Sequence, residues 1–103
     1  MAAQGYVTLT LEAYPEGRSY VSRCSELGVT SCGDSLGDAI ESLKDAVAAY
    51  LNAIEQLGDR DRIFEEKGIE VRKSKPKMVP IGVDRLPPNS VAGPAVFPIT
   101  TAA

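Results

Sequence analysis

Hydrophobic positions recur between residues 34 and 58 at the spacing of one long amphipathic helix. Steps of four and three residues separate them, which places them on a single stripe: Leu36, Ile40, Leu43, Val47, Tyr50, Ile54 and Leu57. Asp34 or Ser35 can cap the start of this helix, and Gly58 supplies the left-handed residue that ends it. Small residues flank the stripe and predict close packing on a flat surface: Ala39, Ala46 and Ala53.

Alternation of apolar and polar residues before this helix predicts the strands of a sheet. Residues 6–13 alternate strictly, and the apolar set on one face is Val7, Leu9, Leu11 and Ala13. Such a pattern is typical of a half-buried strand. After a turn at residues 14–17, we predict a second strand over 18–24 and a third over 29–33. Their short connections favour an antiparallel meander.

A short second helix and a short fourth strand are predicted after Gly58. Residues 59–67 have high helix propensity and end at Gly68, and we expect Ile63 and Phe64 to fold back onto the core. Residues 69–71 form the predicted fourth strand at the sheet edge. The expected fold class is α+β: a three-stranded antiparallel meander plus a short fourth strand, packed against one long helix and one short helix.

The composition changes after residue 71, where six of the seven prolines lie. Neither helical nor strand periodicity persists there beyond a few residues. We therefore predict an α+β domain over residues 1–71 and a Pro-rich basic tail over 72–103, extended or partly disordered. Short extended pieces are possible at residues 78–79 and 95–97, and apolar residues such as Phe97 and Ile99 are suited to docking on a neighbour.

The net charge of −3 divides unevenly along the chain. Residues 1–71 carry six Lys or Arg against thirteen Asp or Glu, and residues 72–103 carry five against one. An acidic body suits a basic partner better than it suits nucleic acid. The basic run of the tail could bind phosphate groups of a nucleic acid. No aromatic residue lies among these charges to stack on bases, and the alternative is a tail that only increases solubility. This run contains Arg72, Lys73, Lys75 and Lys77.

The residue types present limit the possible chemistry. The absence of His excludes Ser-His and Cys-His nucleophile pairs and His-containing zinc sites. Two cysteines, Cys24 and Cys32, are too few for a disulfide framework, and we expect free thiols. No apolar run approaches the roughly 18 residues of a membrane span, and the first residues are too polar for a secretory signal. A cytoplasmic location is expected.

Several carboxylates offer an enzymatic alternative, a metal-dependent nuclease, because two-metal hydrolysis needs convergent carboxylates. The candidates are Glu12, Asp34, Asp38 and Glu41. Asp34 and Asp38 are also explained by the positive end of the helix dipole, and Glu41 falls on the exposed helix face. We therefore favour a non-enzymatic domain with no catalytic residue, no metal and no cofactor.

Residues 20–51 contain a set of short motifs in a characteristic order. The pattern is a strand ending in a Cys-x-Glu-Leu turn, a Gly-Asp-Ser cap, and a helix with spaced alanines and a Tyr-Leu pair. It is carried by Tyr20-Val21-Ser22-Arg23-Cys24, Glu26-Leu27-Gly28-Val29, Ser31-Cys32-Gly33-Asp34-Ser35, Ala39, Leu43, Ala46 and Tyr50-Leu51. This pattern resembles a HicB-type antitoxin domain over roughly residues 5–71, and the continuation at residues 57–69 resembles small stand-alone members of that family. The resemblance implies a degraded RNase H-like fold. It also implies a small basic HicA-type toxin, which cleaves mRNA, as the partner that this domain silences, and dimers or higher oligomers.

The resemblance and the acidic body together predict a protein-binding domain that neutralises the toxin by occlusion. We predict partner-binding residues at the second strand and its turn: Tyr20, Arg23, Glu26 and Leu27. Fuller family members continue into a helix-turn-helix or ribbon-helix-helix that binds operator DNA, whereas this chain has Pro-rich sequence there, which argues against DNA binding. The alternative is an orphan oligomerising or regulatory domain without a toxin. A free sheet edge and a small core favour a homodimer.

Overall fold

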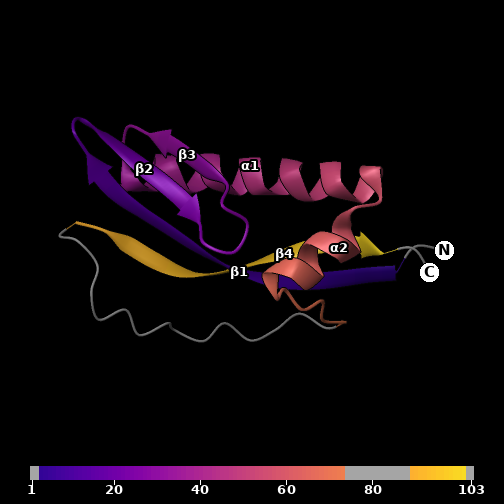
Figure 1. Ribbon diagram of the computed structural model, residues 1–103. Coiled ribbons are helices and arrows are strands. Elements are labelled where there is room, and N and C mark those ends of the chain that lie inside the picture. Colours follow the sequence, from indigo (N-terminus) through magenta and orange to yellow (C-terminus); the bar gives the residue numbers. More distant parts are fainter. Residues whose placement is uncertain (1–2, 74–88, 102–103) are drawn as a thin grey trace.

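The computed structural model describes residues 3–73 and 89–101, which form one antiparallel sheet packed against two helices (Figure 1). The elements are β1 (Ala3–Glu16), β2 (Ser19–Cys24), β3 (Thr30–Gly33), α1 (Leu36–Leu57), α2 (Arg60–Lys67) and β4 (Val91–Thr101). The strand order is β3-β2-β1-β4, and every neighbouring pair is antiparallel. The predicted α+β class is confirmed.

The core lies between α1 and the central strand β1. The alternating apolar residues of β1 are all buried, as predicted, and they face the helix: Val7, Leu9, Leu11 and Ala13. Phe64 of α2 joins the same cluster, which confirms that the short helix folds back onto the core. The polar residues between them in β1 point to the other side of the sheet, called here the outer face.

The predicted ends of the long helix are also confirmed. Ser35 is the N-cap, and its Oγ accepts a hydrogen bond from the Asp38 backbone N–H at 3.0 Å. Gly58 ends the helix in the left-handed conformation, with φ of 74°. Its N–H donates to the carbonyl of Glu55, which satisfies one of the orphan carbonyls of the last turn.

The buried face of α1 differs from the predicted stripe at its C-terminal end. The buried residues advance mostly by steps of four: Ala39, Leu43, Val47, Leu51 and Ile54. Each step of four overshoots a full turn of a 3.6-residue helix by about 40°, so this contact face winds around α1. The sheet beneath is twisted, and a winding face follows it. Leu57 falls outside that face and is 74% exposed, so its predicted place in the core is wrong.

Leucine truncation tests this winding face. We expect Leu51→Ala to lower the free energy of unfolding by about 2–5 kcal/mol, because it leaves a cavity at a buried site. The same change at the exposed Leu57 should cost no more than about 0.5 kcal/mol. Denaturant unfolding followed by circular dichroism measures both, and a larger loss at Leu57 than at Leu51 would place the core contact along the predicted stripe.

Small residues allow the start of α1 to touch the sheet. A Cβ atom on Gly33 would lie 2.5 Å from the backbone nitrogen of Ala39, so no side chain fits there. Ala39 and Ser22 are fully buried, and the Ser22 hydroxyl donates to the Ala39 carbonyl at 2.8 Å. Close packing at Ala39 was predicted, whereas Ala53 lies exposed. The first turns of α1 are thereby fixed on β2 and β3.

The fourth strand lies far from its predicted position at residues 69–71. Residues 69–71 form no strand, and the adjacent Arg72 makes an isolated bridge with Tyr6, in which the two residues exchange backbone hydrogen bonds of 2.8 Å. The fourth strand is β4, which pairs with β1 from Ala3 opposite Thr101 to Ala13 opposite Val91. The predicted boundary at residue 71 therefore does not separate residues 91–101 from the domain. The extended piece expected at residues 95–97 lies inside β4.

Two prolines fit in β4 because of their register. The backbone N–H and C=O of Tyr6 point away from β4 and bond with Arg72. Thr10, four residues further along β1, has its backbone groups on the same side of the strand. The residues opposite them in β4 are Pro98 and Pro94, which therefore occupy non-hydrogen-bonded positions. The missing N–H groups would have pointed to the outer edge of β4, which pairs with no strand among the described residues. Proline thus costs no ladder bond here, and it protects an open edge from further pairing.

Replacing both prolines tests this edge protection. We expect Pro94→Val with Pro98→Val to keep the fold and to promote aggregation, since valine restores two edge donors and raises strand propensity. Light scattering during prolonged incubation measures the effect. Thr8→Val, which adds a valine without a new donor, is the control. A double variant that stays as dispersed as the wild type would show that the prolines do not protect the edge.

Candidate functional site

The predicted partner-binding residues of β2 lie on opposite faces of the sheet. Tyr20 is half-buried and lies opposite Gly33, on the face that carries α1. Arg23 is exposed and lies opposite Thr30 on the outer face. Successive residues of a strand alternate between the two faces of the sheet. Tyr20 and Arg23 are three residues apart, so their side chains lie on opposite faces. A single flat partner cannot cover both.

Glu26, the third predicted contact, is bound to the edge of β1. Its carboxylate accepts hydrogen bonds from the Thr10 backbone N–H at 2.8 Å and from the Thr10 hydroxyl at 3.0 Å. The neighbouring Ser25 N–H donates to the Thr10 carbonyl at 3.0 Å. Since β2 ends at Cys24, this loop satisfies the part of β1 that β2 does not reach. Glu26 therefore supports the sheet.

The fourth predicted contact, Leu27, is a core residue, 7% exposed, and offers no surface to a partner. The nearby Cys24 is fully buried, and Cys32 is exposed; both thiols are free, as predicted. Burial raises the pKa of the Cys24 thiol above its ordinary value, against a smaller lowering by a hydrogen bond with the Leu27 backbone. A protonated, buried thiol is a packing group and not a nucleophile.

Alanine substitution separates the roles of Glu26 and Arg23. Glu26→Ala leaves the Thr10 N–H without its acceptor, so we expect a loss of about 1–3 kcal/mol in the free energy of unfolding. Arg23→Ala should change stability by less than about 0.5 kcal/mol, because that side chain is exposed. Chemical denaturation measures both variants, and a Glu26→Ala protein as stable as the wild type would refute the supporting role.

The structure divides the four carboxylates proposed for a nuclease. Asp34, Asp38 and Glu41 line one shallow hollow of about 380 Å³ at the N-terminal half of α1. Glu12 lies between the buried Leu11 and Ala13 in β1, so it points to the outer face, away from that hollow. Within residues 3–73 and 89–101, no three His, Cys, Asp or Glu side chains are grouped so that they could hold a metal ion.

The hollow also contains Asp45, which sequence reasoning did not single out although it continues the helical spacing from Glu41. We call Asp34, Asp38, Glu41 and Asp45 the acidic row. All four are exposed. Lys44 lies 3.6 Å from Glu41, and in the described part of the chain no other ion pair involves this row. The N-terminal half of α1 therefore presents largely unneutralised negative charge.

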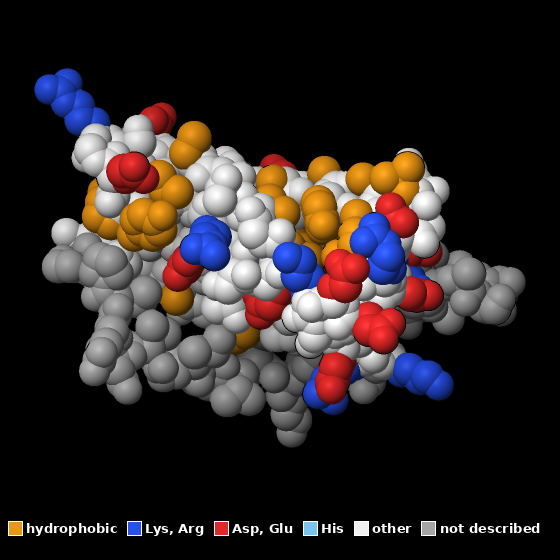
Figure 2. Space-filling view, in the orientation of Figure 1, with side chains coloured by type: hydrophobic (Ala, Val, Ile, Leu, Met, Phe, Trp, Pro, Cys, Tyr) orange, Lys and Arg blue, Asp and Glu red, His pale blue; other side chains and the backbone are white. Residues whose placement is uncertain are grey.

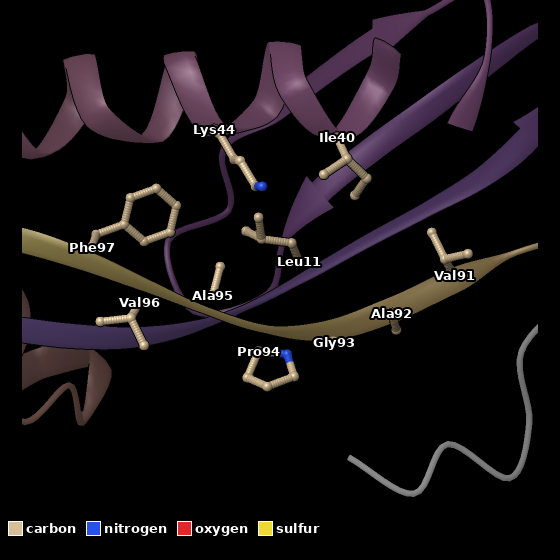
Figure 3. Close-up of a pocket in the computed structure, with 10 residues that line it drawn as sticks. All are labelled: Leu11, Ile40, Lys44, Val91, Ala92, Gly93, Pro94, Ala95, Val96 and Phe97. Atoms are coloured by element: carbon tan, nitrogen blue, oxygen red, sulfur yellow. The ribbon is translucent and has the colours of Figure 1, made fainter. Parts of the chain in front are cut away.

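A second surface feature is a groove between α1 and β4, called here the α1–β4 groove. It consists of a hollow of about 540 Å³ and a second of about 190 Å³, and Phe97 lines both. Figure 3 shows Ile40 and Lys44 reaching into the larger hollow from α1, with Leu11 and Ala95 facing them from the sheet. The sequence reasoning missed this groove because its floor is β4.

The predicted phosphate-binding run is described only in part. Arg72 and Lys73 are exposed, and Arg72 pairs with Glu70 at 3.2 Å. Lys75 and Lys77 lie outside the described residues, as does the extended piece expected at residues 78–79. The described part of this run therefore contributes one uncompensated cation, Lys73, to the surface.

Comparison with known proteins adds no family to this picture. No known protein family, curated protein or solved structure matches the chain. Neither α1 nor α2 combines the length and apolar character needed to cross a bilayer. The HicB-like resemblance accordingly rests on the residue pattern of roughly residues 5–71, chiefly on the motifs between positions 20 and 51.

Proposed function

We propose that this protein is an antitoxin-like binding domain of the cytoplasm. It neutralises a small basic HicA-type toxin, which cleaves mRNA, by covering the toxin's RNA-binding face. It acts as a homo-oligomer and has no catalysis of its own. The resemblance of residues 20–51 supplies the identity of the partner. The structural observation that supports the proposal is the acidic row on α1, whose charges are largely unneutralised.

The acidic row suits a partner that binds RNA phosphates with a basic surface. A run of like charge on a rigid helix raises the association rate and orients the approaching partner. Once the partner is bound, the carboxylates occupy the place of the phosphates, and RNA is excluded. Inhibition of this kind needs a stable complementary surface and no reacting group.

Of the predicted partner-binding residues, Tyr20 remains part of this surface. It lies opposite Gly33 in the register of β2 and β3, and Gly33 lines the same hollow as Asp34. Tyrosine is enriched among residues that dominate binding energy at interfaces. We therefore place Tyr20 at the rim of the toxin-binding surface and the acidic row at its centre. Arg23 on the outer face, the engaged Glu26 and the buried Leu27 lie outside it.

A charge-neutralised variant tests the proposal. In it, Asp38→Asn, Glu41→Gln and Asp45→Asn remove three charges from the acidic row. The control removes three charges from α2 through Asp61→Asn, Glu65→Gln and Glu66→Gln. The ligand is a purified small basic toxin of the HicA type. We expect the first variant to bind about tenfold more weakly at low salt and to lose most of the salt dependence. The control should stay within about threefold of the wild type.

Calorimetric titration at about 0.05 M and about 0.3 M salt measures these affinities. Growth of cells that express this toxin together with the chain measures neutralisation. Equal weakening by both variants would show that only net charge matters, and the acidic row would lose its role. A wild-type chain that neither binds nor restores growth would overturn the antitoxin proposal.

The second candidate function is the orphan oligomerising domain. The α1–β4 groove favours it, because an open apolar groove on a small domain is a surface for another protein. The residual nuclease has no comparable support, since Glu12 lies on the face opposite the acidic row.

A further inference from the structure

The α1–β4 groove is open because α1 lies over β1, β2 and β3 and leaves part of β4 uncovered. One wall is a flank of α1 that includes Ile40, Lys44, Ala48, Asn52 and Glu55. The floor is the helix-facing side of β4, where Val91 is 41% exposed. This flank of α1 runs about 23 Å from Ile40 to Glu55, the length of four helical turns.

The edge of β4 indicates what kind of element can fill the groove. An added strand would need a row of edge N–H donors, and Pro94 and Pro98 remove two of them. A helix needs none, because its backbone groups are satisfied internally. Helices commonly dock in apolar grooves with one face. The expected occupant is therefore a helix.

The exposed side of α1 has the character of such an occupant. Between Asp45 and Glu55 this helix contains no charged residue. Ala48 and Ala49 are both exposed there, and small side chains let two helix axes approach to about 8–10 Å. Figure 2 shows the other side of α1, away from the groove, where hydrophobic side chains gather over its C-terminal half and α2 beside it carries charges.

The two charged residues of the groove wall are arranged for self-complementarity. Lys44 and Glu55 lie on the same flank of α1, at equal distances on either side of a point between Ala49 and Tyr50. When two copies of α1 pack antiparallel about that point, the Lys44 ammonium of each copy faces the Glu55 carboxylate of the other. Glu55 is held in place by Arg60 at 2.7 Å.

We propose that α1 of a second copy occupies the α1–β4 groove, antiparallel to the first, so that each copy fills the groove of the other. The two sheets then enclose a central pair of helices. The uncharged stretch of each α1 packs against the partner's β4, and two Lys44–Glu55 pairs fix the register. This interface is the surface for the homo-oligomer proposed above, and it does not require a bound toxin.

Gly93 provides a sharp test, because it lines the groove and a Cβ atom there would meet nothing within 4 Å. Gly93→Phe should fill the groove without disturbing the single chain. Ala48→Glu places a charge on the same flank, and Ala53→Glu, an identical change at an exposed position outside the groove lining, is the matched control. We expect both groove variants to raise the dimer dissociation constant about tenfold or more, and the control to leave it within about threefold.

Sedimentation equilibrium of the full chain measures the dissociation constant, with the monomer mass at 10.9 kDa. Circular dichroism confirms that each variant folds; if Gly93→Phe does not, the comparison of Ala48→Glu with Ala53→Glu decides. A wild type that stays monomeric at all concentrations would overturn the interface. So would a dimer that tolerates the groove variants, or one that Ala53→Glu dissociates instead. Toxin binding by the Gly93→Phe variant is measured separately. This measurement distinguishes a failure of the proposed dimer interface from a failure of the antitoxin proposal.

Discussion

The contact between the first turns of α1 and the strands β2 and β3 determines where the long helix lies. Gly33 leaves no room for a side chain, Ala39 fills the remaining space, and the buried Ser22 hydroxyl bonds to the Ala39 carbonyl. Such a hydrogen bond contributes about 1 kcal/mol, but its removal would leave a polar group buried. With the helix fixed at this corner, its contact face winds along the sheet, and β4 is left partly open.

The central strand β1 is longer than β2. Two other segments of the chain form hydrogen bonds with the part of β1 that β2 does not reach. The loop after β2 bonds to Thr10 through Ser25 and Glu26, and the bridge to Arg72 serves Tyr6. At the far side of the sheet, prolines protect β4. With both ends of β1 occupied and the outer edge of β4 poor in donors, association through strands is disfavoured. The other edge strand, β3, is only four residues long, so helix packing offers this domain the more extensive contact surface.

Most of the α+β body could be predicted from local pattern, because local physics determines it. Strict alternation identified β1, and the caps at Ser35 and Gly58 identified the ends of α1. The failures share one cause, which is dependence on distant partners. Leu57 was misplaced because the winding of the contact face depends on the twist of the sheet. β4 was missed because proline opposes strand pairing unless the register directs its nitrogen outward.

The candidate site was less predictable than the fold. Periodicity says which face a strand residue occupies, but it does not say where a loop side chain turns, and Glu26 and Leu27 both turn inward. The acidic row was found in part, because Asp34, Asp38 and Glu41 recur at helical spacing. That Lys44 is the one cation paired with this row among the described residues depends on the tertiary structure. The α1–β4 groove could not be predicted from the sequence, because β4, which forms its floor, lies in the segment that was predicted to be a tail.

The pairing of β1 with β4 joins Ala3 to Thr101, so the two strands that complete the sheet come from opposite ends of the chain. Contacts of such high sequence separation carry a large loop-closure entropy, and they slow folding in proportion to their share of the native structure. The hairpin of β1 and β2 and the helix α1 can form early from local contacts. We therefore expect β4 to dock last, after the hairpin and α1 have formed.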